Sequence, residues 1–124
     1  MKQGELGRTY RAGETIARQG EIGDCMYVIQ AGKVEVVRDS GTGEVRLAEL
    51  AEGDFFGEMA LFEKEVRSAT VRALGEARAL TIDKKMFLRK VHEDPSLAFR
   101  IMQKMSQRIR ELDDQLTGLL TQSG

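Results

Sequence analysis

The residues best suited to binding chemistry lie between positions 53 and 71, where a glycine turn, a short apolar helical turn and a charged loop lead to an arginine. A helix N-terminus offers unpaired backbone N–H groups and the positive end of its dipole. Gly57 lets a ligand approach that backbone closely, and the guanidinium fork of Arg67 fits a phosphate through two hydrogen bonds. The segment therefore predicts a small anion pocket, with Glu58 left as a hydrogen-bond acceptor.

The alternative interpretation of these residues is an exposed ion pair between Glu58 and Arg67, which would be worth about 0–1 kcal/mol. The neighbours of the two residues favour the pocket. Gly57 directly precedes the glutamate, and the small residues Ser68 and Ala69 follow the arginine. We therefore retain the pocket as the working hypothesis.

The order and spacing of these residues resemble the phosphate-binding cassette of cyclic nucleotide-binding domains, as found in the bacterial catabolite activator family and in the regulatory subunits of cAMP-dependent protein kinase. The family pattern is roughly Phe-Gly-Glu, an apolar residue and Ala-Leu, a loop of variable length, and then Arg-Ser/Ala/Thr-Ala. It stands here as residues 56–61 and 67–69. The resemblance extends from about Tyr10 to Leu120 and implies a sensor of cyclic nucleotides.

The resemblance also implies a role for each residue of the cassette. Arg67 would neutralise the cyclic phosphate, and the backbone amides of residues 57–60 and of Ala69 would complete the cradle. The Ser68 hydroxyl offers a further donor, and Glu58 would accept a hydrogen bond from the ribose 2′-hydroxyl. The predicted cyclic nucleotide-binding residues are Leu47, Phe56, Gly57, Glu58, Met59, Ala60, Arg67, Ser68 and Ala69.

The base of the ligand stays open between adenine and guanine. By family position, Leu47 would form an apolar wall against the base. A serine after the cassette arginine fits cAMP in this family, but the hydroxyl of Ser68 can also reach guanine. Catabolite activators read adenine with a Thr-Ser pair, and the aligned residues here are about Leu112 and Asp113, of which the leucine cannot make that contact. The predicted ligand is therefore cAMP or cGMP, and no cofactor is expected.

Short strands must position this cassette. Alternating apolar residues bounded by turn residues predict strands over 25–30, 33–38, 45–50, 67–73 and 78–82. This spacing indicates an antiparallel roll or barrel, which the resemblance narrows to an eight-stranded β-roll. We therefore expect an α+β, mainly β, fold: an antiparallel double-stranded β-roll, or jelly-roll barrel, over about 9–82, with the cassette and its short helix over 53–71.

From Asp83 the apolar period changes from two to about 3.6, which predicts C-terminal helices over about 83–120. Asp83 and Asp94 can cap them, with Pro95 at the first position of the last helix. That helix carries a seven-residue apolar repeat typical of a coiled-coil seam. The repeat is Ala98, Met102, Met105, Ile109, Leu112, Leu116 and Leu119. The helix could pack on its own roll, but its second half would then expose leucines, so we favour a homodimer through the residues from Met105 to Leu119.

Composition fits a single domain over residues 1–124. The 19 basic and 20 acidic residues balance, so nothing draws the chain to nucleic acid or to a membrane. There is no signal-peptide core and no apolar run of about 18 residues, and Cys25 is the only cysteine, so we expect a cytoplasmic protein without an internal disulfide. His92 is the only histidine, and no nucleophile or metal-ligand cluster accompanies it, so we expect neither an enzyme nor a metal site.

Two functions compete on this reading. In the first, the chain is a cyclic nucleotide sensor that transmits occupancy through its last helix. In the second, it is a ligand-independent dimerisation or protein-interaction domain that retains the roll. The sequence up to Gly124 contains no helix-turn-helix, so we expect no direct DNA binding. The sequence does not identify the effector protein.

Overall fold

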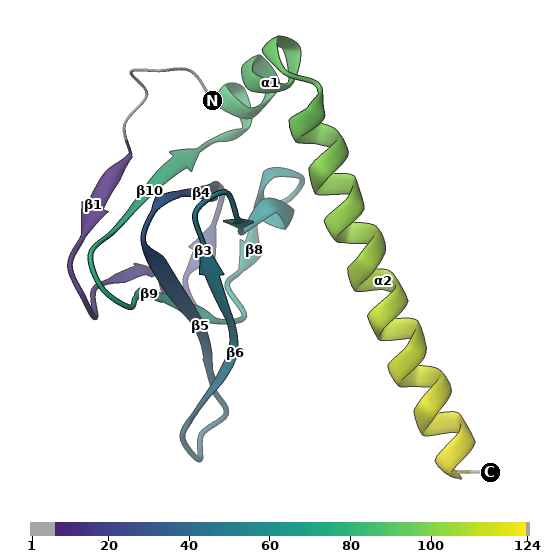
Figure 1. Cartoon of the computed structure of the whole chain (residues 1–124). Coiled ribbons are helices and arrows are strands. Elements are labelled where there is room, and N and C mark those ends of the chain that lie inside the picture. The colour runs from purple at the N-terminus through teal and green to yellow at the C-terminus, as the bar shows by residue number, and fades with distance from the viewer. Residues whose placement is uncertain (1–6, 124) are drawn as a thin grey trace. The chain divides into compact units, whose positions relative to one another are not determined.

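The computed structural model describes residues 7–123, and their side chains as far as residue 120. This part of the chain divides after Met86 into a strand-rich unit and a helical unit. The strands are β1 (Arg8–Tyr10), β2 (Thr15–Ala17), β3 (Ile22–Gly23), β4 (Met26–Ala31), β5 (Lys33–Asp39), β6 (Glu44–Ala51), β7 (Phe55–Phe56), β8 (Glu65–Val66), β9 (Thr70–Ala73) and β10 (Ala77–Ile82) (Figure 1). A short 3₁₀ helix, η1 (Glu58–Leu61), follows β7.

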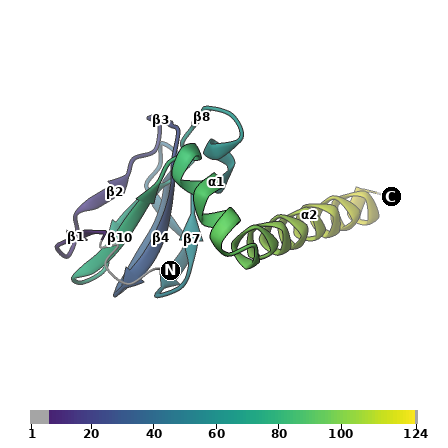
Figure 2. The ribbon, with the colours of Figure 1, turned by 90° about the horizontal axis from the view of Figure 1, so that it is seen from above.

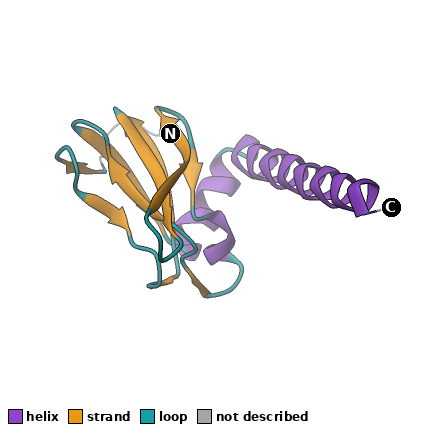
Figure 3. Cartoon of the chain, turned by 90° about the horizontal axis from the view of Figure 1, so that it is seen from below, coloured by secondary structure: helices purple, strands orange, loops and turns teal. Residues whose placement is uncertain are grey.

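The strands form two antiparallel four-stranded sheets, which Figure 2 shows from above and Figure 3 shows in orange from below. One sheet has the order β1-β10-β4-β7 and the other has the order β2-β9-β5-β6. The short strands β3 and β8 pair separately. The expected fold class, a mainly β antiparallel roll with helices, is confirmed, and the β3–β8 pair is an addition to its eight strands.

Apolar side chains that alternate along the strands fill the space between the two sheets. Val34 on β5 lies opposite Leu50 of β6 and Ala73 of β9, and its side chain is fully buried. Ile29 on β4 is 1% exposed. Burying a side chain of this size is worth about 1.5–3 kcal/mol. The buried cluster consists of Tyr10, Ile16, Ala17, Ile29, Val34, Phe56, Val71, Ala73, Ala77 and Ala79.

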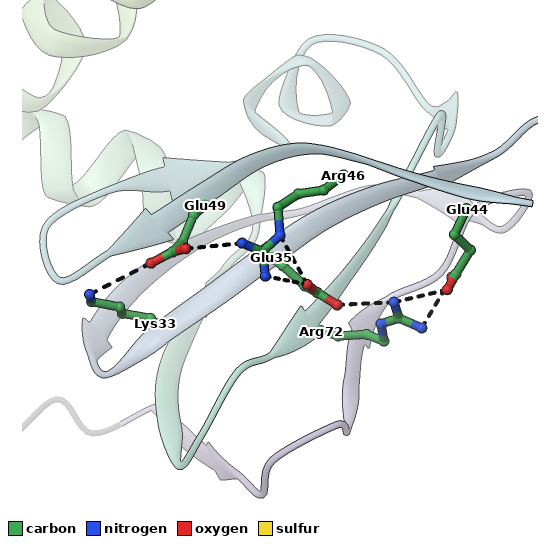
Figure 4. A network of polar contacts seen from close by, with 6 residues as sticks. All are labelled: Lys33, Glu35, Glu44, Arg46, Glu49 and Arg72. Atoms are coloured by element: carbon green, nitrogen blue, oxygen red, sulfur yellow. Dashed lines mark hydrogen bonds and ion pairs between the residues drawn. The ribbon is translucent and has the colours of Figure 1, made fainter.

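Charged residues of β5, β6 and β9 form a network of ion pairs across the sheet (Figure 4). Glu35 is at its centre, 2.7 Å from Arg46 Nη2 and 3.0 Å from Arg72 Nη2. Arg72 also contacts Glu44, and Arg46 also contacts Glu49. The hydrogen bonds from Arg46, and then from Arg72, hold the pKa of Glu35 below its usual value. The network ties the three strands together along their polar side.

Each of the two C-terminal helices begins with an aspartate that caps it. Asp83 Oδ1 accepts a hydrogen bond from Met86 N at 2.7 Å, at the start of α1 (Lys84–Glu93). Asp94 Oδ1 accepts from Ser96 N at 3.1 Å and from Ser96 Oγ at 2.6 Å, at the start of α2 (Ser96–Ser123). Both aspartates therefore cap a helix as predicted. The last helix begins one residue after Pro95 and continues through Gly118, past the expected end.

The predicted apolar repeat of α2 is largely exposed in the single chain. Its exposed members are Met102, Ile109, Leu112, Leu116 and Leu119, each between 55% and 67% exposed. Met105 is half-buried. Neither helix of the described residues has a stretch apolar and long enough to cross a lipid bilayer.

Candidate functional site

A left-handed glycine turn begins the predicted cassette. β7 ends at Phe56, and Gly57 then has φ 79° and ψ 15°. Residues with a Cβ rarely adopt this conformation, so glycine is the residue that permits the turn. The N–H of Ala60 donates to the Gly57 carbonyl at 3.1 Å and closes the first turn of η1. This amide is thus already used within the helix, whereas the sequence had assigned it to a ligand.

Backbone hydrogen bonds fix the position of Arg67. The pairing of Ile22 with Val66 brings β3 beside β8, directly before the arginine. Beyond this pair, Arg67 N donates to the Glu21 carbonyl at 2.8 Å, and Gly20 N donates to the Arg67 carbonyl at 2.9 Å. The expectation of a strand starting at residue 67 is wrong. Arg67 lies between β8 and β9, because its backbone bonds to the loop before β3.

The guanidinium of Arg67 lies beside the glycine turn. Its Nη2 donates to the Cys25 carbonyl at 2.8 Å and lies 3.7 Å from the Cys25 sulfur. Its Cζ lies 5.6 Å from the centre of the Tyr27 ring, within reach of a cation–π interaction. A Cβ placed on Gly57 would lie 2.5 Å from Arg67 Nη1. The structure therefore brings together the two residues that the sequence singled out first.

The ring of Tyr27 supports this arrangement and was not among the predicted site residues. It stacks on Phe56 with the ring centres 4.9 Å apart and an angle of 18° between the planes. Burial, and then a side-chain hydrogen bond with Cys25, raises the pKa of Tyr27 to about 12. The phenol is therefore neutral at physiological pH. No motif in the sequence marks Tyr27, because its contacts with Phe56 and Arg67 join residues far apart in the chain.

The other predicted residues differ in their exposure. Glu58 is 4% exposed and Ala60 is 7% exposed, whereas Met59 is 39% exposed. The Ser68 carbonyl accepts a hydrogen bond from Arg38 Nε at 3.0 Å. The remaining two are Ala69, which is half-buried, and Leu47 on β6, which is 48% exposed. Glu58 is thus buried directly after the glycine turn.

The chemistry of the site suits an anion. A guanidinium held beside a glycine turn offers several N–H donors in one plane, with a positive charge that cannot be removed at physiological pH. Among the described residues, no group of three histidine, cysteine, aspartate or glutamate side chains is placed to hold a metal ion. The arrangement is therefore suited to binding a phosphate.

Comparison with known proteins identifies the family. The model of the cyclic nucleotide-binding domain matches residues 7–94. The cAMP-dependent protein kinase regulatory subunit of Schizosaccharomyces pombe is 45% identical over 80 residues, which are 64% of this chain and 19% of that protein. The cyclic AMP receptor protein of Thermus thermophilus is 33% identical over 110 residues, which are 88% of this chain and 51% of that protein.

Solved structures agree with this assignment. The catabolite activator protein of Thermus thermophilus matches with a TM-score of 0.80 and 33% identity, over 90% of this chain and 53% of that one. The cGMP-bound and cAMP-bound structures of the EAL enzyme Bd1971 match with TM-scores of 0.65 and 0.63 and 33% identity, over 84% of this chain and 28% of that one. The matched part of the chain spans about a fifth of the Schizosaccharomyces pombe regulatory subunit and about half of the Thermus thermophilus receptor protein. The chain belongs to the cyclic nucleotide-binding domain family.

Proposed function

We propose that this domain is a receptor that binds cAMP, with cGMP as the alternative ligand, through Arg67 and the glycine turn at Gly57. The observation that carries the proposal is the position of the Arg67 guanidinium, hydrogen-bonded to the Cys25 carbonyl and next to Gly57. A cyclic phosphate beside that turn would replace hydrogen bonds to water with charge-assisted bonds to Arg67. The missing Cβ of Gly57 leaves the space that the guanidinium occupies.

Glu58 would then bind the ribose. Its side chain is buried, and a carboxylate in such a place contributes to binding when a hydroxyl donates to it. Ser68 and Leu47 are proposed for the phosphate and the base, respectively. The preference for cAMP rests on the names of the relatives, which are cAMP-dependent and cyclic AMP receptor proteins. Ser68 fits cAMP in this family, although its hydroxyl can also reach guanine. The alternative, cGMP, rests on that second possibility and on the cGMP-bound form of Bd1971.

The output of the receptor is proposed to involve α2. Its exposed repeat, from Met105 to Leu119, would pair with the same helix of a second copy. Ligand binding would change the population of two helix arrangements and so act on an effector protein. The relatives named above are a regulatory subunit and a receptor, in keeping with a regulatory rather than a catalytic role.

The exposed repeat also favours a second candidate, a domain whose function is dimerisation and which uses no ligand. The two candidates differ in one measurement, the thermal stability of the purified domain with cAMP, cGMP or AMP added. A receptor should be stabilised by about 2.7 kcal/mol when the nucleotide is present at a hundred times its dissociation constant. Stabilisation by the cyclic nucleotides but not by AMP supports the receptor, and a dimer without any response supports the second candidate.

Replacement of Arg67 tests the site itself. A hydrogen bond to a charged group contributes about 1.5–3 kcal/mol, so Arg67→Ala should weaken cAMP binding roughly 10- to 150-fold. Arg67→Lys should recover only part of this loss, because lysine keeps the charge but not the fork. Isothermal titration calorimetry measures both, and unchanged binding by Arg67→Ala would refute the assignment.

A further inference from the structure

Gly23 lies directly against the guanidinium of Arg67. It is buried in β3, opposite Glu65 of β8. A Cβ placed on Gly23 would collide with Arg67 Nε and Cζ and would lie 2.7 Å from Arg67 Nη2. Nη2 is the atom that donates to the Cys25 carbonyl. The side of the guanidinium that Gly23 contacts is thus the one that anchors it.

We propose that Gly23 is a positioning residue for Arg67, and that the absence of its side chain is what allows the guanidinium to occupy the place from which it binds the phosphate. The consequence for ligand binding rests on the proposed function. The placement of Arg67 itself does not. Gly23, Gly57, the Cys25 carbonyl and the Tyr27 ring together form the seat of the arginine.

The backbone does not explain the glycine at position 23. The described glycines that need a left-handed conformation are 13, 20, 32, 41, 43, 53 and 57, and Gly23 is not among them. An alanine at position 23 is therefore compatible with the local backbone. Space for Arg67 is the requirement that remains.

The nature of the neighbouring atoms predicts how an alanine would act. At Gly7 and Gly32 an added Cβ would collide with backbone atoms, of Ala79 and of Glu76 respectively, so the sheet itself would have to shift. At Gly23 the colliding atoms belong to the end of the long side chain of Arg67. Gly23→Ala should therefore move the arginine and leave the roll folded.

The experiment compares Gly23→Ala with a matched control, Gly75→Ala. A Cβ on Gly75 meets nothing within 4 Å, and the backbone there is not left-handed. Gly57→Ala would be a poorer test, because the φ of 79° strains any alanine at that position. We expect Gly23→Ala to weaken cAMP binding roughly 10- to 100-fold, as displacements of about 1 Å do at sites that depend on orientation. Gly75→Ala should bind as the wild type does, and equal affinities of the two variants would overturn the proposal.

A second measurement needs no ligand. Gly23→Ala breaks the hydrogen bond from Arg67 to Cys25, so it should lower the melting temperature by ~2–6 °C in the wild-type background. In the Arg67→Ala background there is no guanidinium to displace, so this loss should disappear and only the general effect of replacing glycine by alanine should remain. If Gly23→Ala changes the melting temperature by the same amount in both backgrounds, or changes it in neither, the proposal is overturned. The wild type could bind no cyclic nucleotide while the effect of Gly23→Ala on the melting temperature still depends on Arg67. That result would refute the proposed function but support Gly23 as a positioning residue for Arg67.

Discussion

Similar apolar side chains are buried in the roll but exposed on α2. Ile29 on β4 is 1% exposed, whereas Ile109 on α2 is 67% exposed. The roll pairs its strands, fills its interior and anchors its one cassette arginine on its own backbone. In the apolar repeat of α2, by contrast, five side chains are each more than half exposed. The candidate site residues that the structure brings together lie in the strand-rich unit, whereas the exposed repeat lies in the helical unit.

The largest effect expected from this difference is on stability. Ile29→Ala should lower the free energy of unfolding by about 2–5 kcal/mol, because it removes buried methyl groups and leaves a cavity. Ile109→Ala should change the stability of the monomer by no more than about 0.5 kcal/mol. Urea denaturation at a concentration low enough to keep the chain monomeric measures both. Similar losses in the free energy of unfolding for the two variants would show that Ile109 is buried within one chain, and would contradict the difference between the roll and α2.

A smaller effect is expected on self-association. Leu116 belongs to the exposed repeat, and burying a leucine side chain is worth about 1.5–3 kcal/mol. Leu116→Lys should therefore weaken the dimer roughly 10- to 150-fold. The control is Gln107→Lys, which adds the same charge at an exposed position outside the repeat. Sedimentation at several concentrations compares them, and equal dimer fractions for the two variants would argue against the proposed seam.

The smallest expected effect concerns acid stability of the roll. The pKa of Glu35 is held below its reference value of 4.5 in the folded chain, so its stabilising contribution is present above that pH and is lost as the pH falls through the folded pKa. The difference in melting temperature between wild type and Glu35→Gln should therefore be largest near neutral pH and shrink on acidification. Glu63→Gln, at an exposed residue of the cassette loop, is the control. A difference independent of pH would contradict the role of the ion pairs in Figure 4.

Much of the site could be predicted from the sequence, and the reasons are local. Gly57 and Arg67 were identified because glycine turns and guanidinium groups have chemistry that residue type alone reveals. The caps at Asp83 and Asp94 were identified for the same reason. The exposed face of α2 followed from a seven-residue repeat, which depends only on spacing. These features need no knowledge of how distant strands meet.

The parts that were missed all depend on distant pairing. Gly23 was not singled out, because glycine is common in turns and nothing in the sequence shows that β3 would pair with β8. The strand expected to start at Arg67 was wrong for the same reason. The hydrogen bond between Arg67 and Cys25 joins residues 42 positions apart, and its acceptor is a backbone atom that every residue possesses. A sequence carries no mark of such a partner.

This last feature bears on how the site tolerates change. Because Arg67 is anchored on the carbonyl of residue 25, any amino acid at that position offers the same acceptor. Substitutions of Cys25 should leave the anchor in place, and no change at that position could compensate for the loss of the arginine. A search for residues that vary together with Arg67 would pass over its nearest hydrogen-bond partner. Such a search would instead detect Gly23 and Tyr27, because the contact with Arg67 depends there on the lack of a side chain or on the aromatic ring.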